Sequence, residues 1–201
     1  MNKKLFVFFL GMLLLFSSLA ARPVFYFNTG MSKPFAPEEF KQYWRAGYNI
    51  GAGVGFPLSE RFELQGVLFY DNLALDDTRY IDKITDKTAY ASVTDGDTHI
   101  GSLWANAKLF IPSEQNDKVT PFLTGGVCIA NRLIAEKEIF TEQKTFTEEK
   151  QSDMVPGAGI GLGFDIEMGS GTLLNIQVRM HALFTDDISI YAPVTLGVKI
   201  K

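Results

Sequence analysis

The sequence predicts an all-β protein: an eight-stranded antiparallel up-and-down transmembrane β-barrel preceded by a cleavable signal peptide. Three observations predict this fold. Apolar residues alternate with glycine or polar residues over long stretches, the connections between these stretches differ in length, and an export signal is recognisable at the start. Successive side chains of a strand point to opposite faces, so alternation gives one apolar and one polar face. Long strands joined by unequal connections are typical of outer-membrane barrels.

Residues 1–21 have the features of a secretory signal peptide. Two lysines precede the apolar run 5–16, and mostly small residues lead from there to Ala21. The apolar run is shorter than the ~20 residues that a membrane-spanning helix needs, so cleavage after Ala20 or Ala21 is expected. The mature outer-membrane β-barrel domain is then residues 22–201.

Charge and cysteine content narrow the classes of function. Without the two lysines of the signal, 17 basic residues stand against 23 acidic ones, which gives a net charge of −6. A mildly acidic exported domain is a poor candidate for binding nucleic acid. Cys128 is the only cysteine, so hydrogen bonding and packing, rather than an internal disulfide, must hold the fold.

Eight strands follow one another along the mature chain. They are expected at residues 24–31, 47–58, 61–75, 98–111, 120–133, 154–168, 172–184 and 191–201. Long connections are expected at residues 32–46, 76–97 and 134–153, and shorter ones at 57–60, 112–119, 169–171 and 185–190. Long and short connections therefore fall at opposite ends of the meander, as in barrels with short periplasmic turns and longer outer loops.

The strands differ in what occupies their polar face. The second and sixth strands alternate apolar residues with glycines, whereas the fourth, fifth, seventh and eighth alternate them mainly with polar residues such as Asn106 and Thr195. The third strand has the weakest pattern, because Val67 and Phe69 lie on its polar face.

The glycines indicate which face lies inside the barrel. The interior of a narrow barrel is crowded, and glycine there leaves room for long side chains opposite. The polar face is therefore expected to line a filled lumen, where buried charges must be paired. The expected interior polar network consists of Glu63, Asp71, Lys108, Arg132, Asp165, Glu167, Arg179 and Lys199.

A short helix is expected in the first long connection. Pro37 suits the first turn of a helix, and Phe40, Tyr43 and Trp44 share one face at helical spacing. This helix would pack at the barrel rim. Trp44 and Tyr48 are interpreted as part of the aromatic belt at the membrane interface.

Two motifs resemble a known family. The run FKQYWRAGYNIGAGVGF at 40–56 resembles the first-loop and second-strand signature of small bacterial outer-membrane β-barrel proteins of the OmpA/OmpX-like kind. The run PFLTGGV at 121–127 is similar to the fifth strand of the same group. The resemblance extends over the mature chain. It implies an eight-stranded barrel in the bacterial outer membrane, inserted by the barrel assembly machinery.

Motifs for cofactors and metals are weak. The glycines of 51–55 and 157–163 are spaced by two, unlike the G-x-G-x-x-G of dinucleotide sites. Asp95-Gly96-Asp97 lacks the full spacing of a calcium loop. No cofactor and no metal site are therefore expected.

The expected role is non-enzymatic: a monomer in contact with outer-membrane lipids that supports envelope integrity or surface interaction. The near repeat of 140–144 at 146–150 is interpreted as a hairpin extending beyond the membrane, where a surface partner could bind. Two alternatives stay open. One is a soluble periplasmic lipocalin-like carrier of an apolar ligand. The other is an enzyme acting on lipid A or phospholipids through His99 or His181 at the outer rim.

Overall fold

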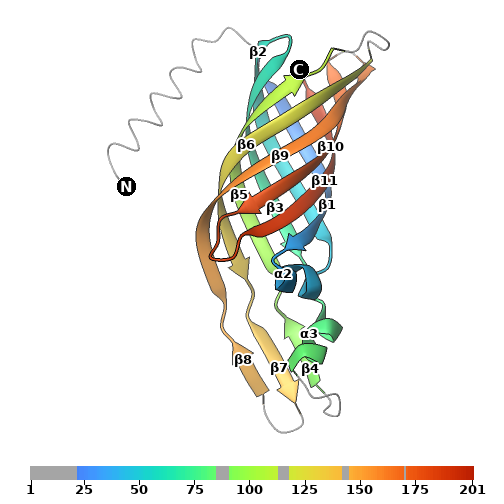
Figure 1. Cartoon of the computed structure of the whole chain (residues 1–201). Coiled ribbons are helices and arrows are strands. Elements are labelled where there is room, and N and C mark those ends of the chain that lie inside the picture. Colours follow the sequence, from blue (N-terminus) through green and yellow to red (C-terminus); the bar gives the residue numbers. More distant parts are fainter. Residues whose placement is uncertain (1–21, 85–90, 113–117, 142–144, 170) are drawn as a thin grey trace, which may run out of the picture.

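Eight strands close into one antiparallel barrel, as predicted, in a computed structural model of the chain (Figure 1). The structure describes residues 22–84, 91–112, 118–141, 145–169 and 171–201, so the expected signal peptide lies outside the described residues. The barrel strands are β1 (Val24–Ala36), β2 (Gly47–Ser59), β3 (Phe62–Leu73), β5 (Thr98–Phe110), β6 (Val119–Ile134), β9 (Gln151–Gly169), β10 (Thr172–Leu183) and β11 (Ser189–Ile200).

The strands form an up-and-down meander that closes between the first and the last. Their order around the barrel is β1-β11-β10-β9-β6-β5-β3-β2. All eight predicted strands are present. The first runs on to Ala36 instead of ending at Met31, because its alternation continues: Ser32 and Pro34 are buried, and Lys33 is exposed. The register with β11 becomes irregular only between Pro34 and Ala36.

The apolar face of the strands points outward, as the glycine argument predicted. Leu68 and Ile160, near the middle of β3 and β9, are 62% and 71% exposed. Glu63 and Asp165, on the same two strands, are 0% and 1% exposed. The barrel therefore buries its charges and exposes its apolar side chains, the reverse of an ordinary soluble protein.

Two layers of side chains fill the lumen. An ionic layer, which contains the buried Glu63, Lys108, Asp165 and Lys199, lies toward the short turns. An apolar layer lies toward the long connections. The apolar layer consists of Val67, Phe69, Leu73, Ile100, Trp104, Cys128, Ala130, Val155, Leu183 and Tyr191, together with Phe40 from the first long connection. Apolar side chains therefore share this half of the lumen with buried polar ones such as Asp71 and Arg179, and the expectation of a polar interior did not include them. The apolar residues that interrupt the polar face of β3 begin this layer.

The long connections fold into an ordered extension beyond the barrel. Its elements are α2 (Glu38–Tyr43), α3 (Asp77–Ile84), β4 (Ala91–Asp95), β7 (Lys137–Thr141) and β8 (Thr145–Glu148). Figure 1 shows it at the end of the barrel opposite the C-terminus. The predicted helix is α2, which Pro37 precedes as N-cap. The described part of the near repeat contributes to the paired strands β7 and β8, with Ile139 opposite Phe146, and β4 pairs with β7 to complete a three-stranded sheet.

Asp76 connects this extension to the barrel end. Its carboxylate accepts a hydrogen bond of 2.8 Å from Arg45 Nη2 and lies 3.4 Å from Arg79 Nε. Its backbone N–H donates to the carbonyl of Tyr43. The hydrogen bond from Arg45 is the main reason why the pKa of Asp76 is lowered from its usual value.

We expect the attachment of α3 to weaken in acid. Because the folded-state pKa of Asp76 is lowered, its contribution is complete above the unfolded pKa of ~4 and is lost as the pH falls through the folded value. The protection of the α3 amides from hydrogen exchange, measured relative to the intrinsic exchange rate at each pH, should therefore fall below pH ~4. At neutral pH, Asp76→Asn should show the same loss of protection, whereas Asp77→Asn, at the exposed neighbouring position, should not. Unchanged exchange in Asp76→Asn would contradict this account.

Candidate functional site

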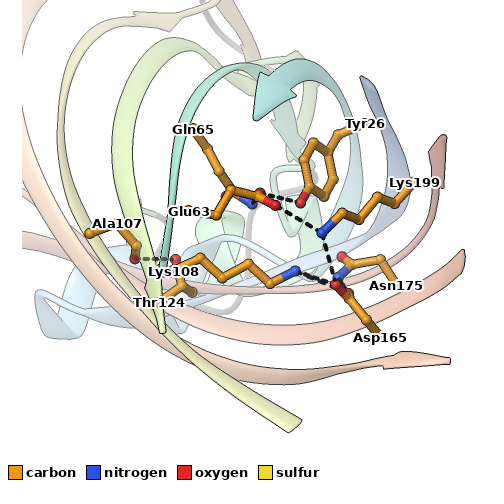
Figure 2. Close-up of polar contacts among 9 residues, drawn as sticks. All are labelled: Tyr26, Glu63, Gln65, Ala107, Lys108, Thr124, Asp165, Asn175 and Lys199. Carbon is orange, nitrogen blue, oxygen red and sulfur yellow. Dashed lines mark hydrogen bonds and ion pairs between the residues drawn. The ribbon is translucent and has the colours of Figure 1, made fainter. Parts of the chain in front are cut away.

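Four charged side chains from four strands meet in the ionic layer (Figure 2). Lys108 Nζ on β5 lies 3.0 and 2.9 Å from the two carboxylate oxygens of Asp165 on β9. Lys199 Nζ on β11 lies 2.8 Å from Glu63 Oε2 on β3 and 3.3 Å from Asp165 Oδ2. Two positive and two negative charges balance within this ionic cluster, which ties together strands far apart in sequence.

Neutral side chains complete the hydrogen bonding of both carboxylates. Tyr26 Oη and Gln65 Nε2 donate to Glu63 Oε1, the second at 2.7 Å. Asn175 Nδ2 donates to Asp165 Oδ1 at 2.6 Å. Figure 2 shows these groups converging on the charges from around the lumen. A buried ion pair is tolerated only when its remaining hydrogen-bonding capacity is also used, and this cluster meets that requirement.

Aromatic rings enclose the lysine end of the cluster. Lys108 Nζ lies 3.6 Å from the centroid of the Phe122 ring and 5.4 Å from that of Tyr26. Lys199 Nζ lies 4.8 Å from the centroid of Phe110. A desolvated ammonium over an aromatic face gains cation–π stabilisation, so these rings partly replace the water that the lysines lose.

The other four residues of the expected network lie elsewhere. Arg179 Nη2 donates to Asn106 Oδ1 at 2.7 Å, with its guanidinium 4.7 Å from the centroid of Trp104. Asp71 accepts hydrogen bonds from Ser32 and Tyr191. Both are buried in the lumen between the ionic cluster and the extension.

Arg132 and Glu167 sit at the two ends of the barrel. Arg132 Nη2 lies 3.2 Å from Asp153 Oδ2 at the end that carries the extension. Glu167 is exposed where β9 reaches the short turns. Both positions have the correct facing for the lumen, but they lie where it opens to solvent, and so they do not join the ionic cluster.

A group of aromatic rings fills the lumen on the extension side of the ionic cluster. The ring of His181 lies 4.1 Å from that of Trp104 and 5.0 Å from that of Tyr191, measured between centroids. His181 is 0% exposed, and neither ring nitrogen has a hydrogen-bond partner among the described residues. Gly159 faces this group: a Cβ there would lie 3.0 Å from Trp104 and 2.9 Å from His181. Glycine on β9 thus makes room for aromatic rings as well as for charges.

The structure corrects the expected position of His181 and places His99 on the outer wall. His181 lies within the lumen instead of at the outer rim, because it shares the inward face of β10 with Arg179. His99 Nδ1 lies 2.8 Å from the hydroxyl of Tyr70, and the two rings stack.

Of the two expected belt residues, one lies on the outer face. Tyr48 is 55% exposed, and its ring lies 6.1 Å from that of Tyr70. Trp44 packs instead against Phe40, between the barrel and the extension, where it bridges to Leu75. Residue 44 precedes β2 and belongs to the connection, so the alternation of the strand does not govern its direction.

The lumen has no wide passage at the ionic cluster. A vestibule of about 640 Å³ opens at the short-turn end and is lined by Glu63, Asp165 and Lys199. Between the ionic cluster and the apolar layer lies a cavity of only about 10 Å³. Eight-stranded barrels have interiors that side chains fill, and the two layers described here do so.

Metal-binding groups are absent from the described part of the chain. No group of three or more His, Cys, Asp or Glu side chains there is placed to hold a metal ion. Asp97 instead accepts the backbone N–H of Leu75 at 3.0 Å, next to a turn in which Gly96 has a φ of +90°. None of the described helices is long and apolar enough to cross a membrane.

Comparison with known proteins identifies the fold. No family model and no curated protein matches the chain. Among solved structures, neisserial surface protein A (NspA) covers 89% of this chain and 96% of its own, with 11% identity and a TM-score of 0.53. The chain has the fold of the small bacterial outer-membrane β-barrels. Two Pseudomonas aeruginosa proteins are also similar at TM-scores of 0.50: the N-terminal barrel domain of OprF, at 14% identity, and the outer membrane protein OprG, at 11%. Each covers 90% of this chain and 97% of its own. The resemblance to the OmpA/OmpX-like group is thus confirmed as a shared fold.

Proposed function

We propose that this protein is a monomeric integral protein of the bacterial outer membrane, with the extension outside the cell and the short turns in the periplasm. The observation that carries the proposal is the outer wall of the barrel. On β11 every outward-facing position is apolar: Ile190, Ala192, Val194, Leu196, Val198 and Ile200. Such a surface is costly in water and favourable in lipid.

The closure of the barrel supports the same proposal. A lipid-embedded strand must satisfy all its backbone hydrogen bonds within the protein, and a closed barrel has no free edge. Here β1 pairs with β11 over the length of both strands. The outward-facing tyrosine pair, the exposed Tyr48 and the half-buried Tyr70, lies at the end of the barrel near the extension and suits a membrane–water interface.

The proposed role is non-enzymatic: the barrel contributes to envelope integrity and presents the extension for surface interaction. Its partners are outer-membrane lipids, the barrel assembly machinery during biogenesis, and a surface partner reached through the extension; nucleic acid is not among them. Ordered secondary structure, including the paired strands β7 and β8, supports a presenting function for the extension.

Cell fractionation tests the location. The protein should be recovered with the outer membrane, and unboiled samples should migrate differently from boiled ones, because the closed barrel resists unfolding in detergent. Recovery in the soluble periplasm, without heat-modifiable mobility, would overturn the proposal.

The two alternatives fit the interior less well. A lipocalin-like carrier needs an apolar cavity, whereas this lumen is filled and holds buried charges at one end. Binding of a fatty acid by a detergent-free monomer would favour the carrier. Of the two histidines considered for a lipid-modifying enzyme, His181 is shielded by Trp104 and Tyr191. His99 lies on the outer wall, where it stacks on Tyr70 and bonds to its hydroxyl, so the enzyme alternative rests on His99. Lipid A or phospholipid products that vanish in His99→Ala or His181→Ala would favour the enzyme.

We expect no porin-type conductance. The ionic cluster and the apolar layer lie in series along the lumen, and ions would have to pass both. Planar bilayer recordings of the reconstituted monomer should show no steady, large single-channel current. Such a current would contradict a filled interior.

A further inference from the structure

A pocket beside α2 lies outside both the ionic cluster and the lipid-facing wall. Its volume is about 350 Å³, at the lower end of the ~300–1,000 Å³ of small-molecule sites. Phe40 and Trp44 line it from α2 and the residue that follows, and Thr98 and Arg132 line it from the ends of β5 and β6. Asp186 and Asp187 line it from the connection between β10 and β11. In the proposed orientation this pocket faces the cell exterior.

Three of its lining side chains hold a buried polar atom that the protein does not satisfy. Trp44 Nε1, Thr98 Oγ1 and Arg132 Nε have no hydrogen-bond partner among the described residues. Thr98 is 1% exposed. The indole and guanidinium N–H groups can only donate, and a buried donor without an acceptor is costly. The pocket therefore suits a ligand that carries oxygen atoms able to accept hydrogen bonds.

The charges around the pocket restrict what this ligand can be. The guanidinium of Arg132 already lies 3.2 Å from Asp153 Oδ2. Asp186 and Asp187 add further negative charge, which repels an anion. A purely cationic ligand, in turn, offers nothing for the unsatisfied donors to bind. A neutral ligand whose groups both donate and accept hydrogen bonds fits both conditions.

The aromatic side chains add an apolar surface. The rings of Phe40 and Trp44 lie 5.6 Å apart between centroids. Aromatic side chains supply the apolar contact of small-molecule sites, while a few polar groups fix the orientation of the ligand. A sugar ring combines hydroxyl groups with C–H surface, so it matches both parts of the pocket. We propose that this pocket binds one sugar unit of an oligosaccharide or glycolipid.

Tryptophan fluorescence can test this directly, since the chain has only two tryptophans. Trp104→Phe leaves Trp44, in the pocket, as the sole reporter. The folded protein, in a detergent without a sugar headgroup, is titrated with glucose, galactose and N-acetylglucosamine. At least one should give a saturable change. Adding Thr98→Val, which removes the hydroxyl at constant shape, should weaken that affinity roughly tenfold. Asp187→Asn should also weaken it, whereas Glu138→Gln, on β7 away from the pocket, should not. Heat-modifiable mobility verifies that each variant is folded.

Two results would overturn the proposal. One is a fluorescence that none of the sugars changes, which would mean a pocket filled by water alone. The other is a fluorescence change on adding the free amino acid glycine but none on adding a sugar, which would mean that the pocket binds a zwitterion. Nanodiscs with and without a glycolipid distinguish the sources, since a bound lipid headgroup would compete with the free sugar. Failure of this test leaves the membrane location untouched, because fractionation measures that separately.

Discussion

Replacing Asp165 with asparagine should lower the free energy of unfolding by about 3–5 kcal/mol, the cost of leaving a buried charge without its partner. Asp165 lies within 3.3 Å of both Lys108 and Lys199. Without its charge, Glu63 alone faces two ammonium groups. Asparagine preserves the size of the side chain, so the loss reports on charge rather than on packing.

Glu167→Gln provides the matched control for this experiment. Glu167 lies two positions further along β9, with the same alternation, but it is exposed. We expect its substitution to change stability by less than ~0.5 kcal/mol. Denaturant unfolding in the same detergent, followed by tryptophan fluorescence, compares the two variants. Equal midpoints would show that the ionic cluster does not stabilise the barrel.

A second substitution separates charge imbalance from loss of contacts. In Asp165→Asn, adding Lys108→Met removes the ammonium that has lost its partner, and Glu63 and Lys199 still form a pair of 2.8 Å. The double variant should regain more than half of the lost stability. A double variant weaker than Asp165→Asn by the full cost of another buried charge would mean that contacts, rather than charge balance, dominate.

Leu68→Arg should destabilise the barrel in a bilayer by about 2–4 kcal/mol, the cost of an arginine near the midplane of a membrane barrel. Leu68 lies in the middle of β3 and is 62% exposed. In a water-soluble barrel, an exposed leucine would accept this change with little effect. The substitution therefore measures what surrounds the outer wall.

Phe146→Arg is the corresponding control on the extension. Phe146 on β8 is 53% exposed, and we expect its substitution to change stability by at most ~0.5 kcal/mol, because water surrounds it. Unfolding in lipid vesicles should show a large effect for Leu68→Arg and a small one for Phe146→Arg. Similar small effects for both would argue against insertion in lipid.

Period-two alternation carried most of what the sequence could predict. It located all eight strands, and the glycines gave the correct inward face. It also brought Glu63, Lys108, Asp165 and Lys199 onto that face, where they form the ionic cluster. Facing follows from the parity of a strand, so a single sequence is enough to assign it.

The period-two alternation does not show how far along the barrel axis an inward-facing side chain lies. Arg132 and Glu167 have the inward facing but lie at the barrel ends, and His181 lies deeper than its place in the strand suggested. The apolar layer was missed for a related reason. Val67 and Phe69 were interpreted as interruptions of a polar face, although they belong to the same apolar cluster as Trp104 from another strand. The direction of Trp44 depends on packing by the extension, which alternation does not describe.

The position of Lys199 gives the last strand a role in the order of folding. β11 is synthesised after every other strand, and its Lys199 bonds to Glu63 on β3 and Asp165 on β9. Until β11 arrives, the interior carries two carboxylates and one ammonium from the ionic cluster. A slip of one residue along the seam with β1 would turn Lys199 toward lipid, leaving that imbalance enclosed. The charges of the ionic cluster are therefore balanced only when β11 pairs with β1 in the correct register, because both depend on the position of Lys199.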